Sequence, residues 1–156
     1  MTHNYKAIVE WKNPNNDLNV RSYSRNHSVT FEGKPSLHTS AEPTFRGDKT
    51  LYNPEELLLG ALSSCHMLSY LYRCAINGLV VTGYTDNATG VMETDGSGGK
   101  FTSVTLYPVV TVANESMVEQ AKELHHQANK DCFIANSVNF DVKHEATIEV
   151  ATQTVG

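Results

Sequence analysis

The residues best suited to chemistry lie in one stretch, NPEELLLGALSSCHMLSYLYRC, which spans residues 53–74. It carries two glutamates, two cysteines and a histidine among apolar residues. If the stretch is a helix, Cys65 and Cys74 lie on opposite faces and about 13 Å apart along the axis. The Cα atoms of a disulfide are only about 4.4–6.8 Å apart. The two thiols therefore cannot pair with each other, and the surroundings of each must decide its role.

Cys65 is the candidate nucleophile. A free thiol has a pKa near 8.5, so a reactive cysteine in the middle of a helix needs a cation that the fold brings to it. Arg46, in the sequence FRGDK just before the helix, is the first choice, with Arg21 and Arg25 as substitutes. Glu55 lies about 15 Å along the helix axis from Cys65. If Glu55 serves a Cys65, it serves that of a second subunit.

Cys74 and the histidines have less reactive interpretations. We interpret Cys74 as a small buried hydrophobe. His66 points about 100° away from Cys65 around the helix, which favours a hydrogen-bonded histidine in the core or an interface over a catalytic base. His125, His126 and His144 have no metal-ligand spacing, and the chain lacks CxxC and HExxH. A zinc site made by Cys65, Cys132 and a histidine remains an alternative.

The helix that carries Cys65 has clear end signals. Asn53 is a capping residue, Pro54 fits the first helical position, and Glu56 can complete a capping box. Gly78 is a typical left-handed stop, which gives an expected end near Asn77 and Gly78. The helix is apolar on nearly every side, so we expect it to be buried. Because it is as long as a domain of this size is wide, part of it needs a second subunit as cover, which predicts an obligate dimer.

The rest of the chain predicts short strands and one more helix. The second helix is expected to be capped by Asn114 and to end before Cys132, and a short irregular piece, CFIANSV, follows it. Pro108 suggests a bulge or a sheet edge. The expected strands are residues 6–12 and 27–32, separated by the polar turn 13–17; a short strand around Leu37; residues 79–94 and 101–112, joined by a DGSGGK hairpin turn; and residues 140–150. This order predicts an α+β fold with antiparallel pairing, in a single domain of residues 1–156.

Composition narrows the classes of function. The chain has 156 residues, a formal net charge of −5, and 12 Lys and Arg residues that form no basic stripe, so we expect no nucleic-acid partner. The sequence shows neither a signal peptide nor an apolar run of about 20 residues, so we expect a cytoplasmic protein with no membrane partner. Three cysteines in such a chain favour free or catalytic thiols over a disulfide framework.

NPEELLLGALSSC, followed by the lone Cys132 between a helix and a final strand, resembles the OsmC/Ohr family of thiol-dependent hydroperoxide reductases. The likeness covers nearly the whole chain. It implies an intertwined α+β homodimer in which antiparallel sheets pack on a long central helix. By the resemblance, Cys65 is the peroxidatic cysteine, Cys132 the resolving cysteine, Arg46 the family's arginine and Glu55 its acidic partner.

The resemblance further implies a chemistry. The thiolate of Cys65 displaces ROH from an organic hydroperoxide, Cys132 condenses with the sulfenic acid, and an external dithiol reduces the disulfide. No cofactor is needed, and the sequence has no GxGxxG or phosphate loop. Apolar neighbours such as Leu62, Met67 and Leu68 would admit an alkyl tail.

Two alternatives stay open at this point. The chain has CFIANSV where better-studied members have a CPVS-like sequence, and it has His66 and Met67 after the cysteine. Its Arg46 follows Phe45, whereas the family's arginine precedes the aromatic residue. These differences favour a non-catalytic dimeric protein that binds small molecules. The other alternative is a hydrolase that uses Cys65 with His66 or another histidine.

Overall fold

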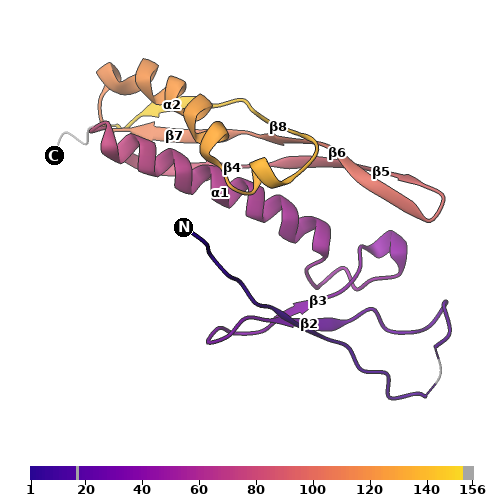
Figure 1. Ribbon diagram of the computed structural model, residues 1–156. Coiled ribbons are helices and arrows are strands. Elements are labelled where there is room, and N and C mark those ends of the chain that lie inside the picture. Colours follow the sequence, from indigo (N-terminus) through magenta and orange to yellow (C-terminus); the bar gives the residue numbers. More distant parts are fainter. Residues whose placement is uncertain (17, 153–156) are drawn as a thin grey trace. The chain divides into compact units, whose positions relative to one another are not determined.

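The computed structural model describes residues 1–16 and 18–152. The described chain forms two compact units, residues 1–58 and residues 59–156, each with its own internal contacts (Figure 1). Asp17, the last residue of the expected turn 13–17, lies outside the described residues. Within the described ranges, no helix is both long enough and apolar enough to cross a membrane.

The first unit is built on a small antiparallel sheet with the order β1-β2-β3. Its strands are β1 (Ile8–Glu10), β2 (His27–Thr30) and β3 (Leu37–Thr39). They confirm the short strands expected within 6–12, within 27–32 and around Leu37. The 3-10 helix η1 (Pro43–Phe45) follows, and the unit ends with the first turn of the long helix α1 (Pro54–Ile76).

The start of α1 follows from its sequence. Asn53 is buried, and its side-chain oxygen accepts a hydrogen bond from the Glu56 N–H at 2.9 Å. The Glu56 carboxylate in turn accepts a hydrogen bond from the Asn53 amide at 3.2 Å. Gly78 has a φ of 70°, the left-handed conformation that ends a helix. The expected bounds of the central helix are therefore confirmed to within two residues.

The second unit contains two three-stranded sheets, with the orders β4-β7-β9 and β5-β6-β8. The pairs β4·β7 and β5·β6 are antiparallel, which confirms the expected antiparallel pairing, and the pairs β6·β8 and β7·β9 add parallel pairing that the sequence did not predict. The strands are β4 (Val81–Asp86), β5 (Thr89–Asp95), β6 (Gly98–Leu106), β7 (Pro108–Val112), β8 (Asp141–His144) and β9 (Thr147–Val150). The fold class is α+β.

Each of the three long strands expected in this unit is divided into two. The break in the segment 101–112 falls at Tyr107, whose backbone N–H donates to the Asp86 carboxylate at 2.6 Å. Pro108 begins the central strand of its sheet, where its missing N–H is tolerated, so the expected bulge or edge position was wrong. The expected hairpin turn is confirmed: Asp95 pairs with Gly98, and Gly96 takes a φ of 61°.

The second helix begins later than the sequence suggested. Asn114 precedes the 3-10 helix η2 (Glu115–Met117), and its side chain makes no capping hydrogen bond, so the expected cap was wrong. α2 (Val118–Asp131) follows directly and ends before Cys132, as expected. The piece after it contains a third 3-10 helix, η3 (Ala135–Ser137).

One face of α1 packs into the core of the second unit. Leu62, His66, Tyr70 and Cys74 form its buried stripe, whereas Leu68, Tyr72 and Ile76 are 62%, 64% and 56% exposed in the single chain. In the single chain α1 is therefore buried on one face, and the cover of its other face by a second subunit stays a prediction. The core cluster comprises Tyr70, Cys74, Leu79, Val110, Val112, Ala121, Leu124 and Ala128.

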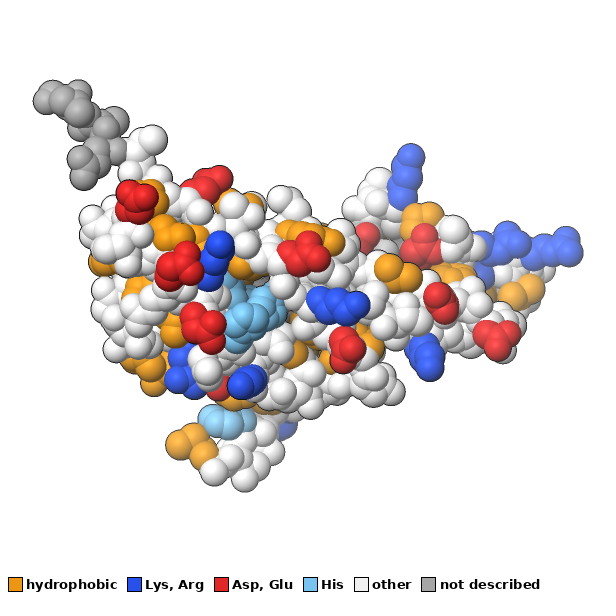
Figure 2. All heavy atoms as spheres, turned by 90° about the horizontal axis from the view of Figure 1, so that it is seen from above, with side chains coloured by type: hydrophobic (Ala, Val, Ile, Leu, Met, Phe, Trp, Pro, Cys, Tyr) orange, Lys and Arg blue, Asp and Glu red, His pale blue; other side chains and the backbone are white. Residues whose placement is uncertain are grey.

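Histidines form an unusual polar part of this interior. His66 and His125 are 1% and 0% exposed, and His66 Nε2 lies 3.0 Å from His125 Nδ1. The His125 ring also stacks on Tyr70, with 3.8 Å between ring centroids. The hydrogen-bonded core histidine expected at position 66 is confirmed. His144 and then His126 continue the cluster outward, and Figure 2 shows histidine side chains gathered on the face in view.

Burial keeps these imidazoles neutral. It lowers the pKa of His66 to about 4 and that of His125 to about 3, and the neighbouring histidines add to both shifts. Asp86 opposes the shift at His66. Because the folded chain binds fewer protons than the unfolded chain below about pH 6.5, stability is lost as the pH falls from there towards about 4.

We expect the free energy of unfolding to fall by about 2 kcal/mol for each of the two buried histidines between about pH 6.5 and pH 5. Urea titrations of the wild type at these pH values measure the loss. His125→Phe, which keeps a stacked ring but cannot titrate, should flatten the pH dependence. The exposed control His38→Gln should leave it unchanged. Equal pH dependence in His125→Phe and the wild type would contradict the assignment.

Candidate functional site

Two cysteines 67 positions apart in the sequence meet in the second unit. Cys65 is partly exposed on α1, and Cys132 is 1% exposed immediately after α2. Burial raises the pKa of Cys132 to about 11, and a hydrogen bond between its thiol and that of Cys65 adds to the shift. Both thiols are free. Two neighbouring thiols can form a disulfide once one sulfur is oxidised.

The turn after α2 holds the sulfur of Cys132. The Ala135 N–H donates to Cys132 Sγ at 3.4 Å, which opposes the rise in the pKa of this thiol. The turn is closed by the Asn136 N–H, which donates to the Cys132 carbonyl at 3.0 Å, and by the Ser137 hydroxyl, which donates to the Phe133 carbonyl at 2.8 Å. The sequence CFIANSV, which looked irregular, is thus an ordered support for one of the two sulfurs.

Cys74 has no part in this pair. It is 1% exposed and lies in the core cluster, where burial raises the pKa of its thiol. Its polar neighbour is the hydroxyl of Tyr70. The expected role of Cys74 as a small buried hydrophobe is confirmed.

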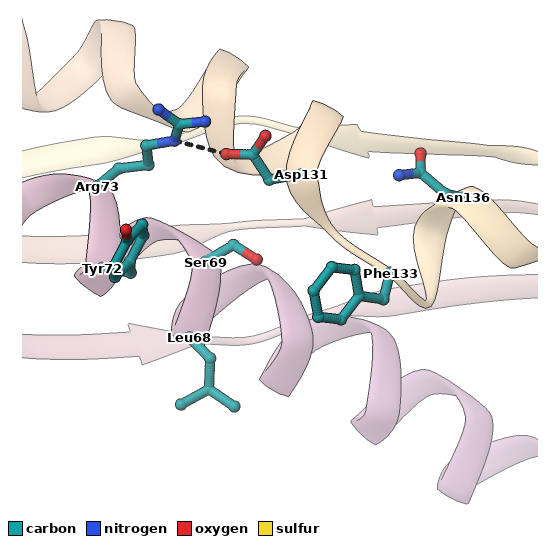
Figure 3. A pocket seen from close by; sticks show the side chains of 7 residues that line it. All are labelled: Leu68, Ser69, Tyr72, Arg73, Asp131, Phe133 and Asn136. Atoms are coloured by element: carbon teal, nitrogen blue, oxygen red, sulfur yellow. Dashed lines mark hydrogen bonds and ion pairs between the residues drawn. The ribbon is translucent and has the colours of Figure 1, made fainter. Parts of the chain in front are cut away.

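A cavity of about 580 Å³ is lined by residues of α1 and of the end of α2 and the turn after it (Figure 3). Leu68 and Ser69 lie one turn after Cys65, and Asp131 and Phe133 flank Cys132 in the sequence. Of the apolar neighbours named from the sequence, Leu68 lines this cavity, whereas Leu62 is 1% exposed in the interior. The full lining is Leu68, Ser69, Tyr72, Arg73, Asp131, Phe133 and Asn136. The wall of the cavity thus contains both apolar side chains and one ion pair, Arg73–Asp131.

Arg46 and Glu55 belong to the first unit. Arg46 is exposed and has a φ of 69°, and its backbone N–H donates to the Pro43 carbonyl at the end of η1. Glu55 lies in the first turn of α1, and its Oε2 atom is buried without a hydrogen-bond partner among the described residues. A buried carboxylate oxygen without a donor is costly, which makes Glu55 a candidate for recruiting a cation.

Arg25, a substitute for Arg46 in the sequence reasoning, is held more firmly. Its guanidinium donates to the Tyr23 carbonyl and, at 2.6 Å, to the Val20 carbonyl. It also lies over the Tyr23 ring, 3.6 Å from the centroid. Arg21 is exposed, and its backbone N–H bonds to Asn19. The first unit therefore presents a fixed guanidinium at Arg25 and an exposed arginine at position 46.

The histidines offer little to Cys65. His66 Nε2 bonds to His125, and His66 Nδ1 is buried without a partner, so His66 makes no hydrogen bond to Cys65. Among the residues that the structure describes, no group of three or more His, Cys, Asp or Glu is arranged to hold a metal ion. Sequence reasoning missed the cluster around His125. The spacing of Ala121, Leu124, His125 and Ala128 on one face of α2 was the available signal.

Comparison with known proteins places the chain in a family. The family model described as OsmC-like protein matches residues 47–147. An OsmC-like protein of unknown function from Vibrio cholerae is 35% identical, with a TM-score of 0.84 over 93% of this chain and 99% of the other. No curated protein sequence matches this chain.

Two more distant structures share the fold. An organic hydroperoxide resistance protein from Elizabethkingia anophelis is 15% identical, with a TM-score of 0.69 over 97% of this chain and 99% of the other. An organic hydroperoxide resistance protein, OsmC, from Legionella pneumophila is 14% identical, with a TM-score of 0.65 over 96% and 100% of the two chains. The family-model match over residues 47–147 and the 35% identity to the Vibrio cholerae protein show that this chain belongs to the OsmC-like protein family.

Proposed function

We propose that this protein is a thiol-dependent peroxidase that reduces organic hydroperoxides to alcohols. The observation that carries the proposal is that Cys65 lies near enough to the buried Cys132 to raise the pKa of its thiol. Two structures of similar fold are of proteins called organic hydroperoxide resistance proteins, which supports this class of substrate. We further propose that it acts in the cytoplasm, in a single domain of residues 1–156.

In the first step, Cys65 attacks the peroxide. Its thiolate bonds to the terminal oxygen of ROOH, the O–O bond breaks, and ROH leaves after taking a proton. Cys65 is the partly exposed member of the pair, so a solute can reach it before it reaches Cys132. The apolar part of ROOH would lie in the cavity against Leu68, Tyr72 and Phe133.

In the second step, Cys132 resolves the sulfenic acid. Its sulfur bonds to that of Cys65, the S–O bond breaks, and the hydroxyl leaves as water with the proton of the Cys132 thiol. An external dithiol then reduces the disulfide and restores both thiols. Every atom and electron of the cycle is supplied by the two cysteines, the peroxide and the dithiol, so the proposal includes no cofactor.

We assign Arg46 and Glu55 to the activation of Cys65. A guanidinium beside the thiol would stabilise the thiolate, and a carboxylate would hold that guanidinium in place. The buried Oε2 atom of Glu55, which lacks a donor, supports a cationic partner for it. We also propose a homodimer, because the exposed apolar residues Leu68, Tyr72 and Ile76 form a face that a second copy can cover.

Steady-state turnover tests the activity. With cumene hydroperoxide and dithiothreitol, we expect the wild type to consume peroxide catalytically and Cys65→Ser to lose at least about 100-fold of the rate. The matched control Cys74→Ser should retain activity because that thiol lies in the core. A wild-type rate no faster than that of dithiothreitol alone would favour the non-catalytic binding protein. A stable acyl-enzyme formed with activated esters would favour the hydrolase.

The rate of Cys65 oxidation in the first turnover tests the charged residues. We expect Arg46→Ala and Glu55→Gln each to lower the second-order rate constant by about 10-fold or more, because a charge that stabilises the thiolate is lost or misplaced. Stopped-flow measurement with Arg25→Ala and Arg21→Ala as matched arginine variants decides the assignment. A large loss in Arg25→Ala with none in Arg46→Ala would transfer the role to Arg25.

A further inference from the structure

An ion pair forms part of the cavity wall beside Cys132. Arg73 Nε lies 2.5 Å from Asp131 Oδ2, and both residues line the cavity (Figure 3). The hydrogen bond from Arg73 lowers the pKa of the Asp131 carboxyl. The two side chains are 32% and 37% exposed, so the pair is open to solvent and to dissolved salt.

Each residue of the ion pair lies on the same segment as one of the two cysteines. Asp131 is the last residue of α2 and precedes Cys132, where the backbone leaves the helical conformation with a ψ of 110°. Arg73 lies two turns after Cys65 on α1. Long side chains on a helix point back towards its N-terminus, so Arg73 extends in the direction of Cys65. The ion pair therefore ties the residue next to one sulfur to the helix that carries the other.

The other side-chain hydrogen bonds that join α1 to α2 within the described residues lie further from Cys132. The Tyr70 hydroxyl donates to the Ala121 carbonyl at 3.0 Å, and His66 bonds to His125. Both hold earlier parts of α2, whereas Arg73 holds its last residue. Motion of the end of α2 relative to α1 is thus opposed directly by the Arg73–Asp131 pair.

We infer that Arg73 and Asp131 are positioning residues for the second chemical step: they hold Cys132 where it can condense with the sulfenic acid of Cys65. This inference rests on the proposed peroxidase function. The step is Cys65–SOH plus Cys132–SH giving Cys65–S–S–Cys132 plus water. An S–S bond forms, the S–O bond breaks, and the thiol proton leaves with the hydroxyl.

A consequence concerns damage by excess substrate. The sulfenic acid that waits for Cys132 can react with a second hydroperoxide to give sulfinic acid and another alcohol, and this product leaves the cycle. Condensation and overoxidation therefore compete for one intermediate. The ion pair would set the fraction of the sulfenic acid that follows each route, because it acts on the rate of condensation.

Two variants and a control test the inference. Asp131→Asn keeps the shape but removes the charge, and Arg73→Met keeps much of the apolar stem. Glu123→Gln is the control, because Glu123 is an exposed residue of α2 away from the cavity. Rapid quenching after cumene hydroperoxide, with dimedone to trap sulfenic acid, gives the rate of each step. Intact mass gives the sulfinic fraction.

We expect condensation to slow about fivefold or more in both variants, and to slow at least about twofold more than the formation of sulfenic acid. The sulfinic fraction should rise in the same proportion. About 1 M salt should slow condensation in the wild type and the control but have little effect on the two variants, because the pair is already broken in them. A merely structural role would not separate the two steps in this way.

The outcomes separate the inference from the proposed function. Wild-type condensation rates in both variants would overturn the inference while leaving the peroxidase intact. Equal slowing of both steps with a lowered melting temperature would overturn it as well, because that result indicates a general loss of structure. A wild type that forms neither sulfenic acid nor disulfide would overturn the proposed function, and the inference with it.

Discussion

The contact between Cys65 and Cys132 depends on the packing of α1 against α2. The two sulfurs are brought together by side chains that are themselves fixed: Tyr70 bonds to the backbone of α2 and stacks on His125, which bonds to His66. These contacts lie on the buried stripe of α1, whereas Cys65 lies beside that stripe and stays partly exposed. α1 thus packs into the core on one face and presents the thiol of Cys65 on the adjacent face.

The unequal burial of the two sulfurs gives the proposed reaction its order. Cys132 is almost fully buried, and its raised pKa keeps the thiol protonated at neutral pH. A protonated thiol is a poor nucleophile, so Cys132 does not compete with Cys65 for the peroxide. The Ala135 N–H offers the Cys132 sulfur a donor when it loses its proton to the departing hydroxyl. Burial thus keeps the Cys132 thiol unreactive during the first step. The ordered turn after α2 then stabilises its sulfur during the second step.

Local signals in the sequence predicted α1 well, because Asn53, Pro54 and Gly78 act on their own neighbours. The pairing of strands was less predictable. The parallel pairs β6·β8 and β7·β9 join segments separated by α2, and alternation of apolar residues along one strand does not reveal its partner. For the site, the resemblance to a family selected Cys65 and Cys132, and the structure brings the two together. Their chemical roles, like those of Arg46 and Glu55, remain predictions, and the histidine cluster became visible only once three elements were packed together.

In the proposed mechanism, the sulfenic acid formed at Cys65 is converted to a disulfide with Cys132 of the same chain. The most direct measurement is peptide mapping by mass spectrometry under non-reducing conditions, after one equivalent of cumene hydroperoxide and rapid alkylation of the remaining thiols. We expect a peptide pair linked through Cys65 and Cys132, with Cys74 fully alkylated. Cys65 and Cys132 both alkylated after the peroxide has been supplied, or a link that involves Cys74, would contradict it.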